Sequence, residues 1–255
     1  MSINNLMAYF LIYSFLGWAL ESIYKTVLEK KLVNSGFLYG PVCPIYGFGA
    51  WIMLVFLKEY SNNILLLFLI SFFILSIWEY IVGLLLEKIF KTKYWDYSKQ
   101  KFNIHGRVCL KNSCFWGILC VIFIKLVHPP IENIVMQVPT ELLVYNNILL
   151  VSIFVIDFIF SVVKIYNINI SIGLLNDITK KIKQELDRVK EYAGNKAKES
   201  EKLQAIIEEL KETQESVKSK LEKQTARLRK AFPTMKHLKL PEFINQRIEA
   251  IRKNK

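Results

Sequence analysis

Five long apolar runs constrain this chain more than any other feature of its sequence. They lie near residues 6–26, 42–58, 64–89, 113–128 and 147–167. A helix needs about 20 residues to cross the hydrocarbon core of a bilayer, so the second and fourth runs must recruit flanking residues. The chain is 53% hydrophobic, yet its formal net charge is +12. This combination favours a membrane protein with cationic cytoplasmic parts over a soluble domain.

The lysines and arginines of the connecting segments predict how the chain is threaded. The segment before the first run and the four connections that follow hold 0, 3, 1, 7 and 0 of them, and the part after Lys164 holds many. Cytoplasmic connections carry an excess of Lys and Arg. We therefore expect a multi-pass protein of the cell membrane with its N-terminus outside and its C-terminal tail in the cytoplasm.

The C-terminal part has the pattern of a coiled coil. Fifteen positions from Ile182 to Ala231 follow each other at spacings of four and three, and eleven of them are apolar. Such heptads predict a parallel dimer, which would make the chain a homo-oligomer. Two alternatives stay open, namely an antiparallel hairpin folded at Gly194 and a single solvated helix.

These patterns together predict the fold class and the domains. We expect an all-α, polytopic helical membrane bundle of about five spans at 1–170, followed by a cytoplasmic coiled coil at 171–231. Residues 232–255 read as a basic amphipathic tail suited to the lipids of an anionic inner leaflet. A merely frayed tail is the alternative.

Three of the carboxylates inside the expected spans are candidate functional groups. Glu21 and Glu79 each share one helix face with a serine and a glycine. The predicted threading places both glutamates at equal depth, in the cytoplasmic third of the bilayer. Charged groups within spans are costly, so they normally face protein or water. Asp157 lies near the middle of the fifth run, and we expect it to pair with Lys164 on the same helix face.

The second run begins with residues that cannot start a regular helix. The stretch NSGFLYGPVCPIYGFGA is rich in glycine and proline, and each proline removes a backbone donor. Interrupted helices at membrane depth are pointers to binding sites in transporters. We therefore expect a broken or re-entrant span, with a plain loop before a short span as the alternative. The candidate hinge residues are Gly36, Gly40, Pro41, Pro44 and Gly47.

The polar segment YWDYSKQKFNIHGRVCLKNSCFWG separates the third and fourth runs. Arg107 is the expected partner of Glu21 or Glu79, because guanidinium binds carboxylate in a bidentate fork. The segment would then close a polar pocket at the inner mouth of the bundle. The alternative is an interfacial linker in which Arg107 binds lipid phosphate. The candidate pocket residues are Glu21, Asn34, Tyr46, Glu79, Tyr80, Trp95, Asp96, Asn103, Arg107 and Asp157.

Five stretches resemble a known family in their order and spacing. SFLGWALESIY, NSGFLYGPVCPIYGFGA, WEYIVGLLLEKIF, YWDYSKQKFNIHGRVCL and SCFWG are similar to the bacterial family described as putative ABC-transporter permeases of the CmpB type, over roughly residues 6–128. The resemblance implies a multi-span inner-membrane protein. The motif positions that it carries over are Glu21, Asn34, Gly36, Gly40, Pro41, Pro44, Tyr46, Gly47, Glu79, Tyr80, Trp95, Asp96, Tyr97, Asn103, Gly106, Arg107 and Trp116.

Three functional classes compete. The first is a permease-like or substrate-binding component of a transporter; because the chain has no G-x-x-x-x-G-K-[ST] motif, a separate ATPase subunit would be its partner. The second is a membrane anchor or scaffold that works through its coiled coil. An intramembrane enzyme using Asp96, His105 and Glu79 comes third, since these residues lack a nucleophile–base spacing. We expect no enzyme activity, metal, cofactor or nucleic-acid partner.

Overall fold

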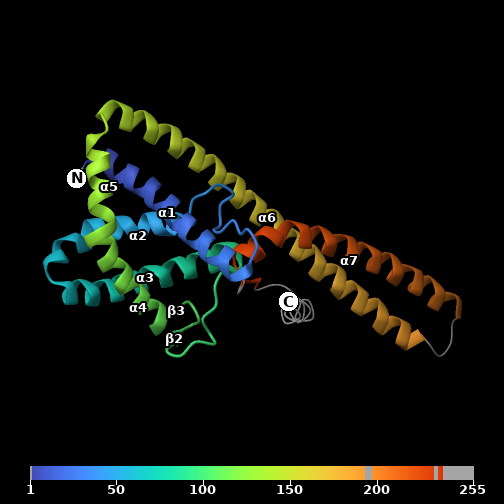
Figure 1. The fold of residues 1–255 in the computed structure, drawn as a ribbon. Helices are drawn as coiled ribbons and strands as arrows, with labels where there is room; N and C mark the ends of the chain where they lie inside the picture. Colours follow the sequence, from blue (N-terminus) through green and yellow to red (C-terminus); the bar gives the residue numbers. More distant parts are fainter. Residues whose placement is uncertain (1, 193–196, 233–234, 238–255) are drawn as a thin grey trace. The chain divides into compact units, whose positions relative to one another are not determined.

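The computed structural model describes residues 2–192, 197–232 and 235–237, and helices dominate it (Figure 1). Within these residues, four helical stretches are long and apolar enough to cross a membrane: Ile3–Leu28, Ile64–Phe90, Leu110–Gln137 and Thr140–Val189. They coincide with the first, third, fourth and fifth apolar runs. A helical membrane bundle is therefore confirmed at the level of four spans, and the second run, at 42–58, is not among them.

Helices α1 (Ile3–Glu29) and α3 (Ile64–Phe90) begin and end in the same way. The Ser2 hydroxyl caps α1 by accepting from the Asn5 N–H at 3.2 Å, and the Asn63 side chain caps α3 by accepting from the Leu66 N–H at 3.1 Å. These caps satisfy donors that a helix start leaves unpaired. Each helix stops where a lysine adopts a left-handed conformation.

Helix α2 (Pro44–Ile52) begins beside the middle of α1, not at its end. The Cys43 N–H donates to the Ser14 carbonyl at 2.9 Å, and the Trp51 indole N–H donates to the Leu6 carbonyl at 2.6 Å. Hence α2 runs antiparallel to α1. Between Glu29 and Pro44 the chain returns about 20 Å along α1, at 1.5 Å per residue, without forming a helix.

The returning segment is partly buried: Leu32 and Tyr39 are 90% and 43% exposed, whereas other side chains pack against the protein. Val33, Ser35, Leu38 and Cys43 are at most 5% exposed. Irregular backbone at membrane depth is tolerated where protein surrounds it. The backbone is thus irregular up to Pro44, where α2 begins; a broken or re-entrant span and a plain loop before a short span both remain predictions. After α2 the chain continues as a π-helical turn η1 (Met53–Leu57) and a 3₁₀ turn η2 (Lys58–Asn62).

The next span is assembled from three consecutive helical pieces. They are α4 (Leu110–Ile122), the π-helical turn η3 (Phe123–Val127) and α5 (His128–Gln137). Helices α3 and α4 pack closely, and Gly117 permits the contact because a Cβ there would lie 2.6 Å from the Phe68 ring. A buried core that includes Tyr9, Leu67 and Cys120 joins α1, α3 and α4.

The connection between α3 and α4 contains short strands. β2 (Asn103–Ile104) pairs antiparallel with β3 (Val108–Cys109), with Asn103 opposite Cys109. β1 (Thr92–Lys93) pairs with β4 (Lys236–His237). The polar segment is therefore a folded β-hairpin directly before α4 and not an extended linker.

The chain divides into two compact units. Met1–Val162 and Leu228–Lys236 form the first, and Val163–Arg227 and His237–Lys255 form the second. Helices α6 (Thr140–Tyr192) and α7 (Ala197–Ala231) both contribute to the second unit. The tail beyond residue 237 and the turn at Gly194 lie outside the described residues.

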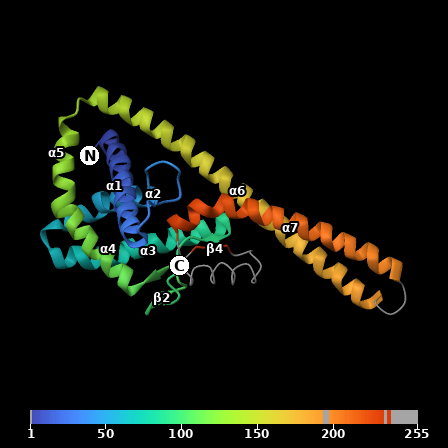
Figure 2. The same cartoon turned by 45° about the vertical axis from the view of Figure 1, so that its right-hand side comes forward.

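Within the second unit, α6 and α7 lie side by side and antiparallel (Figures 1 and 2). The Gln214 side-chain amide donates to the Thr179 hydroxyl at 2.8 Å, which sets the register between the two helices. In that register Ile172 lies level with Leu221, and both are buried, at 2% and 5% exposure. The apolar stripe of α7 is therefore covered within one chain, as in the antiparallel alternative.

Candidate functional site

Glu21 lies in α1 and receives hydrogen bonds from three elements. Its Oε1 accepts from the Tyr46 hydroxyl at 2.8 Å, and its Oε2 accepts from the Ser35 hydroxyl and from Lys25 Nζ, both at 2.9 Å. The side chains of Lys25 and Glu21 are 18% and 26% exposed. The carboxylate thus joins α1, the returning segment and α2 through charge-assisted bonds.

Lys25 also binds the end of α7, in a segment that belongs to the same compact unit as the spans. Its Nζ donates to the Ala231 carbonyl and lies 5.3 Å from the centre of the Phe232 ring. The Phe232 ring meets Tyr94 edge-on at 4.9 Å. A cation is favourable at a helix C-terminus, where the last carbonyls have no partner within the helix.

Glu79 is the more deeply buried carboxylate, at 4% exposure. It accepts from the Asn112 amide at 2.7 Å, the Trp116 indole at 3.1 Å and the Tyr97 hydroxyl at 3.3 Å. All three donors are neutral, and within the described part of the chain Glu79 forms no ion pair. Burial and the neighbouring Glu79 raise the pKa of Tyr97, so this phenol stays protonated at neutral pH and can donate.

Aromatic rings connect the two glutamates. Tyr46, which donates to Glu21, lies 6.0 Å from the ring of Trp116, which donates to Glu79. Gly17 permits this arrangement, because a Cβ there would lie 2.3 Å from the Tyr46 ring. We name the group Glu21, Tyr46, Trp116 and Glu79 the polar seam.

Arg107 does not join the polar seam, and the expected pairing with Glu21 or Glu79 is wrong. Its Nη2 lies 2.7 Å from Glu87 Oε2, its Nε donates to the same oxygen at 2.9 Å, and its guanidinium lies over the Tyr80 ring at 5.2 Å. The reason is geometric: the folded hairpin places Arg107 beside Gly83, where a Cβ would lie 3.6 Å from the arginine. From there the Arg107 guanidinium reaches the carboxylate of Glu87, which lies one turn further along α3.

The remaining candidates in the polar segment shape its fold. The Trp95 indole donates to the Arg107 carbonyl at 2.8 Å, and Asp96 Oδ1 accepts from the Ser98 N–H at 3.1 Å. Asn103 Oδ1 accepts from the N–H of Gly106 at 3.1 Å, and the φ of +67° at Gly106 is one that glycine adopts readily.

Tyr80 and His105 are also placed away from the polar seam. The Tyr80 hydroxyl lies 3.1 Å from His105 Nδ1, at the hairpin. The trio Asp96, His105 and Glu79, weighed as an enzyme site, contacts three separate sets of partners.

Asp157 anchors the returning segment. Its two oxygens accept from the backbone N–H groups of Tyr39, at 3.0 Å, and Gly40, at 2.8 Å. The expected partner of Asp157 was Lys164; these backbone donors occupy the carboxylate instead, because the returning segment passes directly against α6.

Asn34 and the hinge residues hold the shape of the returning segment. The Trp18 indole donates to Asn34 Oδ1 at 2.6 Å, and the Asn34 amide donates to the Tyr39 carbonyl at 2.9 Å. Gly36 has a φ of +92°, which glycine tolerates. The roles of the others are local: Pro41 follows Gly40 at the Asp157 contact, Pro44 opens α2, and Gly47 packs against Ser14.

A second charged cluster, which the sequence reasoning missed, joins α5 (His128–Gln137) to η2 and to α1. Nδ1 of the buried His128 forms a hydrogen bond with the Tyr13 hydroxyl at 2.8 Å, and His128 Nε2 lies 3.5 Å from Glu132 Oε2. Lys58 Nζ reaches both oxygens of Glu132, at 2.8 and 3.0 Å. Two signals were available: His128 and Glu132 are four residues apart, and Lys58 is the single cation of its connection.

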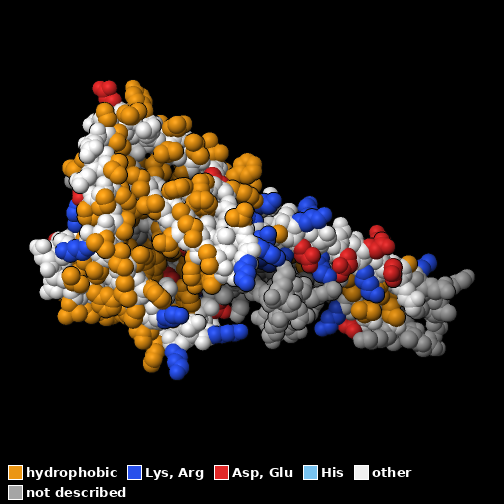
Figure 3. Space-filling model, in the orientation of Figure 1, with side chains coloured by type: hydrophobic (Ala, Val, Ile, Leu, Met, Phe, Trp, Pro, Cys, Tyr) orange, Lys and Arg blue, Asp and Glu red, His pale blue; other side chains and the backbone are white. Residues whose placement is uncertain are grey.

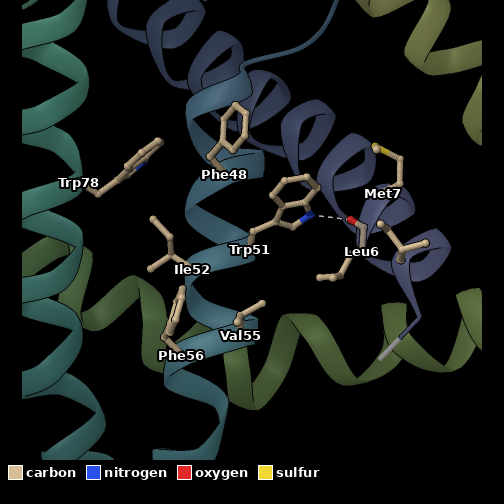
Figure 4. A pocket seen from close by; sticks show the side chains of 9 residues that line it. Leu6, Met7, Phe48, Trp51, Ile52, Val55, Phe56 and Trp78 are labelled. Carbon is tan, nitrogen blue, oxygen red and sulfur yellow. Dashed lines mark hydrogen bonds between the residues drawn. The ribbon is translucent and has the colours of Figure 1, made fainter.

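A pocket of about 400 Å³ lies apart from both charged clusters (Figure 4). Its lining comes from the start of α1, from α2 and η1, and from Trp78 of α3. The Trp51 ring lies between Leu6 and Phe48, and its indole N–H donates to the Leu6 carbonyl. The pocket suits an apolar occupant, since its lining side chains are almost entirely apolar.

The fold and the polar seam define a class of protein. Hydrophobic side chains cover the surface over the spanning helices (Figure 3), and the carboxylates that occur within them bind donors inside the bundle. This combination is that of a multi-pass integral membrane protein.

The chain belongs to the family described as Putative ABC-transporter type IV, whose sequence model matches residues 8–162. The matched region contains Glu21, Glu79 and Arg107, and it extends beyond the quoted motifs to include Asp157. The family resemblance expected from the motifs is thereby confirmed. Comparisons with curated proteins and with solved structures return no match.

Proposed function

We propose that the chain is a permease-like, substrate-binding membrane component of a transporter whose ATPase is a separate subunit. The observation that supports this most directly is Glu79, a carboxylate buried within a span whose bound groups are all neutral donors. Ionisable residues in such positions mark solute or ion pathways. A negative group without a countercharge favours a solute that carries positive charge.

The half-length helix α2 adds to this proposal. It begins beside the middle of α1 after a partly buried irregular segment, and Tyr46 in its first turn belongs to the polar seam. Discontinuous helices of this kind form the substrate sites of many transporters. Movement of α2 along α1 would break the Tyr46–Glu21 bond and open the seam.

Binding of a solute is tested with the purified full-length chain. A panel of small organic cations, amino acids and sugars is screened by thermal shift, and we expect organic cations to raise the Tm of the wild type but not of Glu79→Gln. Trp116→Phe is the matched control, because it removes one donor and keeps the carboxylate. The ATPase is sought among proteins that co-purify with the chain. If no solute stabilises the chain and no subunit with a phosphate-binding loop co-purifies, the proposal fails.

A scaffold that works through the helical hairpin is the second candidate, because α6 and α7 together present a long charged surface. Replacing residues 183–210 by a short Gly-Ser linker would shorten the hairpin and keep the Thr179–Gln214 pair. It also keeps the Lys25–Ala231 contact. A phenotype retained by this variant favours the polar seam, whereas a complete loss with correct membrane insertion favours the scaffold.

A further inference from the structure

The β2–β3 hairpin exposes large apolar side chains next to a membrane-spanning helix. Phe102 is 78% exposed, Ile104 is 57% exposed and Leu110 is 45% exposed. The Leu110 N–H donates to the Phe102 carbonyl at 3.2 Å, so Phe102 lies directly at the first residue of α4. The apolar patch is therefore continuous with the start of a span.

Cations surround this patch. Lys99, Lys101 and Lys111 are exposed, and none of them forms an ion pair among the residues that the structure describes. In Figure 3, Lys and Arg side chains project beside hydrophobic ones at the bottom of the view, where Figure 1 shows the hairpin. Cations next to exposed apolar side chains are the combination that binds an anionic lipid surface.

The hairpin is held in shape independently of any lipid. Asp96 is paired with Lys93 at 3.2 Å, and Arg107 is paired with Glu87. The backbone is fixed by the Tyr97 N–H, which donates to the Gly106 carbonyl at 2.8 Å. Because the polar groups inside the hairpin are occupied, the three lysines remain the charges available to a partner.

We propose that this hairpin is an interfacial anchor, in which Phe102 and Ile104 enter the bilayer and Lys99, Lys101 and Lys111 bind anionic phospholipid headgroups. The occupant is the lipid leaflet at the end of α4, since Phe102 and Ile104 lie eight and six positions before Leu110, the first residue of that span. This inference does not depend on transport, and it replaces Arg107 with the three lysines as the lipid contact.

The test uses the full-length chain in nanodiscs. Phe102→Trp introduces a fluorophore, and its contribution is taken as the difference from the wild type in matched nanodiscs. The lipids are phosphatidylcholine with a fixed fraction of phosphatidylglycerol, and either lipid carries brominated acyl chains. We expect a blue-shifted emission that brominated phosphatidylglycerol quenches more strongly than brominated phosphatidylcholine.

Lysine substitutions then test the charge component. In the Phe102→Trp background, each Lys→Gln change at 99, 101 or 111 should lower the preference for phosphatidylglycerol about fivefold, and the triple variant should abolish it. The matched control removes three exposed lysines of α7, by Lys211→Gln, Lys220→Gln and Lys223→Gln, and should keep the preference.

Two results would overturn the proposal. A red emission that neither brominated lipid quenches would place Phe102 in water or against a protein partner. Equal quenching by both lipids, unchanged in the triple lysine variant, would remove the anionic recognition. Ile104→Trp serves as a second reporter if Phe102→Trp does not fold.

Discussion

The Asp157 carboxylate holds the Gly40 backbone, and the space between them is tight for a side chain at residue 40. The Gly40 N–H donates to Asp157 Oδ2 at 2.8 Å, and a Cβ on Gly40 would lie 3.0 Å from the same oxygen. A residue of the last span thus fixes the partly buried segment that returns along α1. The glycine favours this close approach and does not serve an unusual φ.

Weakening this contact should destabilise the protein. Asp157→Asn retains one oxygen but leaves one of the two N–H groups of Tyr39 and Gly40 without its acceptor, which should lower the free energy of unfolding by about 1 kcal/mol. Thermal unfolding of the purified protein measures the change. Ser161→Ala is the control, because the Ser161 hydroxyl makes only a long contact with Asp157, at 3.5 Å, and its removal leaves both backbone N–H groups with their acceptor. An unchanged Tm for Asp157→Asn would contradict the anchoring role.

The partner of Arg107 can be identified by charge exchange. Arg107→Glu should cost about 3 kcal/mol, since the pair is largely buried, with side-chain exposures of 14% and 19%. Combining it with Glu87→Arg should recover part of the loss, whereas combining it with Glu79→Arg should not. Folded yield and Tm of the single and double variants provide the comparison. Rescue by Glu79→Arg alone would restore the pairing that the structure excludes.

Glu79→Gln should destabilise the bundle as well as the proposed solute site. The amide presents N–H groups where Asn112, Trp116 and Tyr97 also donate, so at least one buried donor loses its acceptor, at a cost of about 1–3 kcal/mol. Chemical or thermal unfolding in detergent gives the value. Glu59→Gln, at an exposed position in η2, should behave as the wild type. A neutral effect of Glu79→Gln would mean that the carboxylate charge is unimportant there.

The end of α7 should depend on Phe232 for its attachment. Phe232→Ala removes the ring beside Lys25 and its contact with Tyr94, with an expected loss of about 1 kcal/mol. Limited proteolysis should then cut near residues 228–236 faster than in the wild type. Lys230→Ala changes an exposed neighbour and should leave the rate unaltered. Equal cleavage of both variants would argue against the attachment.

The antiparallel hairpin predicts which chains cross-link. Thr179→Cys with Gln214→Cys should be bridged within one chain by a short bismaleimide, since these side chains are 2.8 Å apart. On a denaturing gel the product should run as a monomer. Each single variant controls for reaction at the native cysteines, three of which are buried. Predominant cross-linked dimers would instead support a parallel coiled coil between two chains.

Much of the architecture followed from local pattern. Apolar length located four spans, since a helix that crosses a bilayer satisfies its own backbone and needs about 20 apolar residues. Gly36, Gly40 and Pro44 indicated the interruption of the second run, because their backbone limits hold in any fold. The heptads of α7 indicated an apolar stripe but not the helix that packs against it.

Pairing between distant charges could not be obtained in this way. Arg107 has three acidic residues within plausible reach in α1 and α3, and the fold of the β2–β3 hairpin selects Glu87. Likewise Lys58 meets His128 and Glu132 only because η2 and α5 lie together. Orientation in the membrane and the solute remain predictions drawn from charge counts and from the polar seam.

The sequence by itself located four candidate spans and the irregular stretch before Pro44, because hydrophobic length and the backbone limits of glycine and proline act locally. Only the tertiary structure decided the partners of its charges. Asp157 binds the backbone at Gly40, Glu21 binds Tyr46 and Ser35, and Arg107 binds Glu87. Those choices depend on which atoms the packed helices bring within 3 Å, a distance that residue spacing does not encode.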